Sequence, residues 1–133
     1  MMTLRERQDQ FINDLSLFDD WVSRFNYMIE LSDTLSAECP EELRAHRIQY
    51  CKSATYFKAE KRGDKLHVRG WSNTPVMRGM IVCICNILDG ISVDEISGKS
   101  IDFHVKSGLL NNLTSQRQLS LLEIINRVLS VSL

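Results

Sequence analysis

The chain has 133 residues, 44% of them hydrophobic and 25% charged, so it is long enough to form one domain with a buried core. The 16 basic and 17 acidic residues leave a net charge of -1, unlike the clustered Lys and Arg excess of nucleic-acid-binding proteins. The opening "MMTLRERQDQ" lacks the apolar core of a signal peptide, and the apolar stretch 81–88 is too short to span a bilayer. We therefore expect one domain over residues 1–133, located in the cytoplasm, with no nucleic-acid or membrane partner.

The first 35 residues have the spacing of two helices. The first carries a short apolar face: Phe11, Ile12 and Leu15. Asp19 or Asp20 can cap the start of the second helix by accepting hydrogen bonds from its free N–H groups. The second helix has an apolar stripe that we expect to face the core: Trp21, Val22, Phe25, Met28, Ile29 and Leu35.

Residues 54–71 predict an antiparallel β-hairpin. Thr55, Phe57 and Ala59 alternate with more polar residues, which is the period of two of a strand. The "RGD" sequence supplies the turn, since Gly63 can adopt a positive φ at little cost.

The stretch "NTPVMRGMIVCICNILDG" predicts a buried helix. Thr74 suits the N-cap, Pro75 suits the first helical position, and Gly90 can end the helix in a left-handed conformation. Cys83 and Cys85 lie in its middle and point roughly 200° apart, so they cannot bind one metal ion together. We expect both to be buried, unreactive thiols.

The four cysteines do not have the spacing of a metal site. There is no C-x-x-C pair and no Cys/His cluster, and without a signal peptide we expect free thiols rather than disulfides.

The C-terminal third predicts three further helices. "SVDE" at 92–95 matches a capping box for a short helix ending at Gly98, and residues 100–107 predict another. Ser115 and Gln118 have capping-box spacing at the start of the last helix. Its expected buried stripe is Leu119, Leu122, Ile125 and Leu129. The order of elements predicts an α+β fold, with a small antiparallel sheet packed against several helices.

Two residues depart from local rules. Arg117 lies in the first turn of the last helix, where the helix dipole disfavours a cation by roughly a few tenths of a kcal/mol. It either reaches back to a carboxylate or is needed at that point of the surface. Cys51 lies where a polar connection enters the first strand, beside Lys52, a cation that favours thiolate. It is either a packing residue or a functional thiol.

Five stretches in order resemble the SufE family, including CsdE, over about residues 9–130. "FDDWVSRFNYMIEL" resembles the family's W-x(5)-Y-x-I-E-L helix, with matches at Trp21, Tyr27, Ile29, Glu30 and Leu31. "IQYCKSATYF" resembles I-x-G-C-x-S-x-V-W, with matches at Ile48, Cys51 and Ser53. "WSNTPVMRGMI" stands at the D-S-D-A-x-I-V-K-G-L stretch, with matches at Ser72, Gly79 and, conservatively, Arg78. "DGISVDEI" and "SGLLNNLTSQR" resemble G-x-x-P-x-E-I and L-G-L-x-x-x-L-S-x-x-R, and the last contains Arg117.

The resemblance implies a SufE-like fold and a sulfur acceptor. The cysteine at the position of Cys51 takes sulfane sulfur as a persulfide from a cysteine desulfurase and passes it to an iron–sulfur scaffold protein. Pyridoxal phosphate belongs to the desulfurase, so we expect no cofactor and no metal on this chain. The arginine at the position of Arg117 helps the interaction with the desulfurase. We expect Cys51 to be exposed and mobile, in a sulfur-transfer accessory protein rather than a stand-alone enzyme.

The chain departs from the family pattern close to Cys51. Tyr50 replaces the glycine before the cysteine, which stiffens the loop. Thr55-Tyr56 replaces Val-Trp, and Trp71 and Asn73 replace an acidic pair, which we expect to change charge and bulk beside the cysteine. These changes leave two alternatives open: a desulfurase-binding module that carries no sulfur, and a redox-sensing thiol protein.

Overall fold

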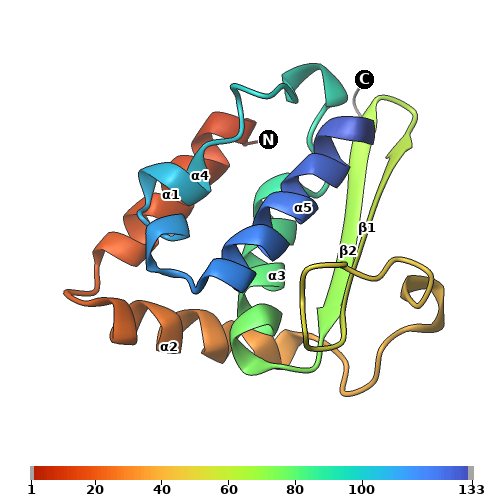
Figure 1. The fold of residues 1–133 in the computed structure, drawn as a ribbon. Helices are drawn as coiled ribbons and strands as arrows, with labels where there is room; N and C mark the ends of the chain where they lie inside the picture. Colours follow the sequence, from red (N-terminus) through yellow and green to blue (C-terminus); the bar gives the residue numbers. More distant parts are fainter. Residues whose placement is uncertain (1, 132–133) are drawn as a thin grey trace.

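A computed structural model describes residues 2–131 and shows an α+β arrangement in which helices pack beside one hairpin (Figure 1). The helices and strands in chain order are α1 (Leu4–Ser16), α2 (Trp21–Leu31), β1 (Thr55–Arg62), β2 (Lys65–Ser72), α3 (Pro75–Leu88), α4 (Phe103–Lys106) and α5 (Ser115–Val131). Short 3-10 helices connect them at Ser32–Thr34, Glu41–Leu43, Val93–Glu95 and Leu110–Asn112. No helix within these described residues is long and apolar enough to cross a membrane.

The hairpin confirms the predicted strands to within one residue. β1 and β2 pair antiparallel, from Thr55 opposite Ser72 to Arg62 opposite Lys65. Gly63 in the turn has a φ of 62°, the left-handed conformation that glycine adopts without strain. Facing residues of an antiparallel pair point to the same side of the sheet, so Thr55 and Ser72 share a face.

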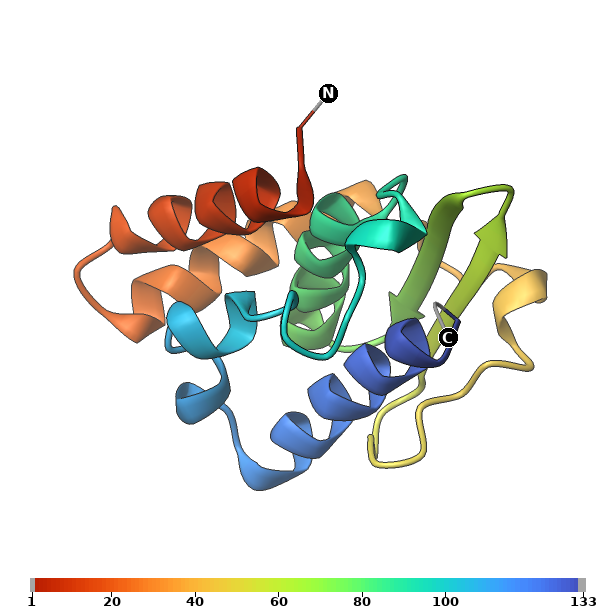
Figure 2. The same cartoon turned by 90° about the horizontal axis from the view of Figure 1, so that it is seen from above.

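Helix α3 occupies the centre of the molecule. Figures 1 and 2 show α1 and α2 on one side of it and the hairpin on the other. Its sequence is apolar nearly all round, as expected for a helix enclosed by other elements. At Gly79 the backbones of α2 and α3 approach so closely that an added Cβ would lie 2.3 Å from the Met28 carbonyl oxygen.

The helix starts agree in part with the sequence prediction. Asp20 is the N-cap of α2, and its Oδ1 accepts the Ser23 N–H at 2.7 Å. Thr74 is the N-cap position of α3, although its hydroxyl makes no capping hydrogen bond. The predicted cap of the last helix is wrong by one residue, because the Thr114 hydroxyl accepts the Arg117 N–H at 3.4 Å.

The two predicted short helices are shorter than expected. Residues 92–95 form a 3-10 turn, and Ser92 accepts the Asp94 N–H, while Glu95 accepts the Leu4 N–H at 3.1 Å instead of closing a capping box. The segment 100–107 is helical only over Phe103–Lys106.

Two expected apolar stripes are partly wrong. Val22 in α2 is 72% exposed. In α5, Leu119 and Leu122 are exposed, and the buried positions are Leu121, Ile124, Ile125 and Val128. The helix carries two overlapping apolar stripes, and its packing on β1 selects the second.

Candidate functional site

Cys51 lies at the tip of the connection that enters β1, as the sequence predicts. Ahead of it, Arg47 and Tyr56 form an isolated antiparallel bridge, and the Ile48 N–H donates to the Thr55 carbonyl at 2.9 Å. The chain then turns over residues 49–54, and Cys51 lies within this turn.

This turn is tied to α5 by hydrogen bonds from its backbone to Glu123. Glu123 accepts the backbone N–H of Gln49 at 2.8 Å and that of Tyr50 at 3.3 Å. Arg127 holds the same carboxylate at 2.8 Å and donates to the His46 carbonyl at 2.8 Å. Tyr50 is 53% exposed and, like every other non-glycine among residues 2–131, has no positive φ. The turn therefore forms without the family's glycine.

The Cys51 side chain is more shielded than the resemblance implies, being only 8% exposed. Its sulfur lies 3.0 Å from the Ser53 hydroxyl oxygen and 3.1 Å from that of Thr55. Thr55 is in turn 2.8 Å from the Ser72 hydroxyl across the hairpin. The expectation of an exposed cysteine is thus wrong for this conformation, and the sulfur faces hydroxyl groups instead of water.

These hydroxyls change the acidity of the thiol. Burial raises the pKa of Cys51, because the thiolate loses hydration. Hydrogen bonds from the Ser53 hydroxyl and backbone, from Thr55 and from Ser120 stabilise the thiolate and together outweigh burial, so the pKa lies below its ordinary value. The site therefore favours the nucleophilic form of sulfur.

Cys51 and Arg117, far apart in sequence, line one hollow of about 280 Å³. The other lining residues are Lys52, Ser53, Thr74, Thr114, Gln116 and Ser120. No acidic side chain among residues 2–131 pairs with the Arg117 guanidinium, so Arg117 does not reach back to a carboxylate. The hollow thus combines a thiolate-favouring sulfur with an unpaired cation.

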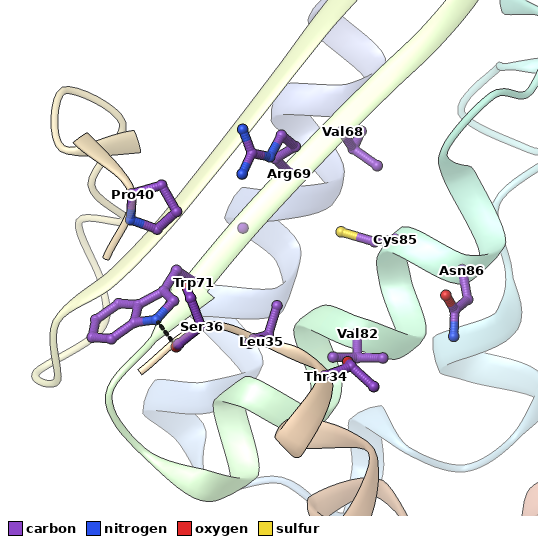
Figure 3. Close-up of a pocket in the computed structure, with 11 residues that line it drawn as sticks. Thr34, Leu35, Ser36, Pro40, Val68, Arg69, Trp71, Val82, Cys85 and Asn86 are labelled. Carbon is purple, nitrogen blue, oxygen red and sulfur yellow. Dashed lines mark hydrogen bonds between the residues drawn. The ribbon is translucent and has the colours of Figure 1, made fainter. Parts of the chain in front are cut away.

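Trp71 lies away from this hollow, contrary to expectation. It follows the strand alternation, so it points to the opposite side of β2 from Ser72. Figure 3 shows its indole N–H donating to the Ser36 carbonyl, at 2.9 Å, in a second hollow of about 350 Å³ that Cys85 also lines. The Arg78 guanidinium lies 5.7 Å from the indole ring. The exposed Asn73 does not line the Cys51 hollow either.

Sequence inspection noted Thr55 as a departure from the family motif and Ser72 as a match, but it did not place their hydroxyls together at the sulfur, and it missed Glu123 altogether. The signal in the sequence was that Thr55 and Ser72 are polar, although each lies on a strand face that otherwise carries core residues such as Phe57 and Leu66. Their opposition across the hairpin required the register.

The helix cysteines lie on different sides of α3, as their spacing predicts. Cys83 lines a hollow between α1, α2 and α3, and Cys85 lines the one beside Trp71. Cys83 is buried as expected, whereas Cys85 is only partly buried, and desolvation raises the pKa of each to about 12. All four cysteines are free, and no cluster of three or more His, Cys, Asp or Glu within residues 2–131 could hold a metal ion.

We expect Cys51 to react first with iodoacetamide, and Cys83 and Cys85 to react last, since only thiolate attacks the reagent. Limited labelling of the native chain near neutral pH, followed by peptide mass mapping, measures the order. The same experiment in denaturant should label all four thiols alike. Fast native labelling of Cys83 or Cys85 would contradict the raised pKa of these two thiols.

The fold and the hollow define a small α+β protein that shields one thiolate-favouring cysteine beside an arginine. The family described as "SufE: Fe-S metabolism associated domain" matches residues 9–131. An uncharacterized SufE-like protein of Rhizobium meliloti is 33% identical over 129 residues, covering 92% of this chain and 91% of that protein. One of Rhizobium etli is 30% identical over 127 residues, covering 90% and 85%. The chain therefore belongs to the SufE family, which is associated with Fe–S metabolism.

A solved structure confirms the fold. The solution structure of a hypothetical protein from Thermus thermophilus is similar with a TM-score of 0.72 and 17% identity, covering 95% of this chain and 93% of that one.

Proposed function

We propose that this protein accepts persulfide sulfur from a cysteine desulfurase onto Cys51 and passes it to a scaffold protein for iron–sulfur cluster assembly. The observation that supports this most is that Cys51 and Arg117 line the same hollow. Each departs from a local rule, and each stands at a working position of the family motif. In this proposal the chain works in the cytoplasm as an accessory protein, and pyridoxal phosphate stays with the desulfurase.

The chemistry is an exchange between sulfur atoms. The Cys51 thiolate attacks the outer sulfur of the desulfurase persulfide, a new S–S bond forms on Cys51, and the S–S bond of the donor breaks. The electron pair leaves on the donor cysteine as thiolate, so no external oxidant or reductant is needed. A Cys51 pKa below its ordinary value increases the fraction of the attacking thiolate near neutral pH.

The hollow can shelter the product. Its volume of about 280 Å³ is several times the roughly 30 Å³ share of one water molecule in the liquid, so an added sulfur atom fits beside Cys51. Because Cys51 is only 8% exposed, the turn 49–54 must open to meet the donor. Docking of the desulfurase supplies that opening in this proposal.

The test is the intact mass of the full chain after incubation with a cysteine desulfurase and cysteine. We expect a gain of one or more sulfur atoms, which peptide mapping assigns to Cys51 and which a thiol reductant removes. No gain, or a gain on Cys39, Cys83 or Cys85, contradicts the proposal.

We expect Arg117→Ala to weaken binding of the desulfurase without loss of stability. A guanidinium that meets a partner carboxylate contributes about 1–3 kcal/mol. Removing a cation from the first turn of α5 should leave the melting temperature unchanged or slightly higher. A binding titration and a melting curve on the same variant measure the two effects.

Two further variants sharpen this result. Arg117→Lys should recover part of the affinity, since an ammonium lacks the two-pronged geometry of guanidinium. Arg44→Ala removes an equally charged, exposed arginine outside the hollow and should bind normally. Normal binding by Arg117→Ala together with a lower melting temperature would make Arg117 a structural residue.

A desulfurase-binding module without sulfur transfer is the second candidate. The shielded sulfur and the turn held by Glu123 favour it, because both hinder access by a donor. This module would bind the desulfurase and would remain unmodified in the mass experiment. A redox-sensing thiol would bind no desulfurase, and Cys51 would be oxidised by peroxide.

A further inference from the structure

Two buried hydroxyls connect the Cys51 sulfur to the far strand of the hairpin. The Thr55 oxygen lies 3.1 Å from the sulfur, and the Ser72 oxygen lies 2.8 Å from that of Thr55. Both side chains are fully buried, and they face each other across β1 and β2. The Thr74 N–H approaches the Ser72 oxygen at 3.4 Å from the start of α3.

The charge state of the sulfur sets the direction of the hydrogen bonds in this chain of hydroxyls. When Cys51 is a thiolate it can only accept hydrogen bonds, so the Thr55 hydroxyl then donates to the sulfur. A hydroxyl donates once, so Thr55 must then accept from Ser72, and Ser72 can accept from the Thr74 N–H. The Thr74 hydroxyl competes weakly for the Ser72 proton, since its oxygen is 3.4 Å away while that of Thr55 is at 2.8 Å.

We propose that this hydroxyl chain, from Ser72 through Thr55, stabilises the thiolate form of Cys51 and so raises the reactivity of the thiol. Thr55 touches the sulfur, and Ser72 acts through Thr55 as a positioning residue. The consequence for sulfur acceptance rests on the function proposed above, whereas the effect on the thiolate does not.

Burial makes these two hydroxyls hard to replace. Water can substitute for the partly exposed Ser53 hydroxyl, but it has no access to Thr55 or Ser72. In such a low-dielectric position hydrogen bonds to a charge are strengthened, and linked hydroxyls polarise one another. Burial alone raises the pKa of Cys51, and the hydrogen bonds from Ser53, Thr55 and Ser120 together reverse that direction.

Thr55 also stands where the family motif has valine. A valine there would leave Ser72 with no link to the sulfur. In this proposal, Thr55 is the departure from the family motif that affects the thiol. The change of charge and bulk expected from Trp71 does not occur beside Cys51.

The test is the pH dependence of Cys51 alkylation by iodoacetamide in the full chain, followed by the mass of the Cys51 peptide. Thr55→Val keeps the side-chain shape and removes the hydroxyl. We expect it to raise the midpoint of the pH–rate profile by about one unit or more. Ser72→Ala should raise the midpoint by a smaller amount, and Thr55→Ser should stay near the wild-type value.

The midpoint of the double variant distinguishes a connected chain of hydroxyls from two independent structural effects. Because Ser72 acts through Thr55, the double variant Thr55→Val/Ser72→Ala should have the midpoint of Thr55→Val alone. An unchanged midpoint in Thr55→Val, an equal rise in Thr55→Ser, or additive rises would each overturn the proposal. If circular dichroism shows that Thr55→Val is unfolded, the midpoint of Ser72→Ala tests the proposal instead. An unchanged midpoint in Ser72→Ala would then overturn the proposal.

This experiment uses no desulfurase, so its outcome is separate from that of the sulfur-loading test. If the midpoints of the variants shift as expected but the wild-type protein never gains sulfur, only the proposed function is refuted. If the wild-type protein gains sulfur but the midpoints of the variants do not shift, only the role of the hydroxyl chain is refuted.

Discussion

Cys51→Ser should abolish sulfur loading while leaving the fold intact. The serine oxygen cannot form a persulfide, so the mass gain expected for the wild-type chain should disappear completely. The hydroxyl can still exchange hydrogen bonds with Ser53 and Thr55, which now lie 3.0 and 3.1 Å from the sulfur. The helical circular dichroism spectrum and the melting curve should therefore stay close to those of the wild type.

Cys39→Ser is the matched control for this variant. Cys39 is a free, partly exposed thiol outside the Cys51 hollow, and burial raises its pKa, so its loss should leave loading unchanged. Loading that persists in Cys51→Ser would remove Cys51 from the proposed chemistry. A large loss of helical structure in Cys51→Ser would show that the thiol mainly packs the core.

Gly79→Ala should destabilise the fold strongly. The new Cβ would lie 2.3 Å from the Met28 carbonyl oxygen and 2.6 Å from its carbon, both rigid backbone atoms of α2. The helices must separate, and overpacking of this kind costs about 1–3 kcal/mol or more. The higher helix propensity of alanine returns about 1 kcal/mol at most. We expect a melting temperature lower by several degrees, on the order of 4 °C per kcal/mol.

Gly98→Ala provides the comparison, because nothing lies within 4 Å of a Cβ added there. Gly98 also lacks the left-handed φ of Gly63, Gly90 and Gly108, so alanine is tolerated by the backbone. This variant should melt within about a degree of the wild type, as surface substitutions without special features usually do. Equal melting of the two variants would contradict the close approach of α2 and α3.

Elements with a strong local signal were predictable from the sequence. The period of two and the Gly63 turn located the hairpin, and Thr74-Pro75 with the apolar run located α3. Cys51 was placed at the entry to β1 by the same local pattern. These features depend on neighbouring residues, whose backbone preferences and side-chain spacing are visible in a short window.

The face of α5 that is buried could not be predicted in this way. Leu119 and Leu122 have helical spacing as good as that of Leu121 and Ile125, and only contact with β1 distinguishes the two stripes. The bond between Glu123 and the Gln49 N–H joins residues 74 positions apart, and no local pattern indicates it.

By itself, the sequence determined which residues are unusual: a thiol at a strand entrance and an arginine in the first turn of a helix. Only the tertiary structure decided that Cys51 and Arg117 share one hollow, and that hydrogen bonds connect the sulfur to Thr55 and Ser72 rather than to Trp71. The physical reason is that side-chain chemistry is local, whereas proximity depends on strand register and helix packing. One residue along β2 separates Ser72, on the face that carries Thr55, from Trp71 on the opposite face.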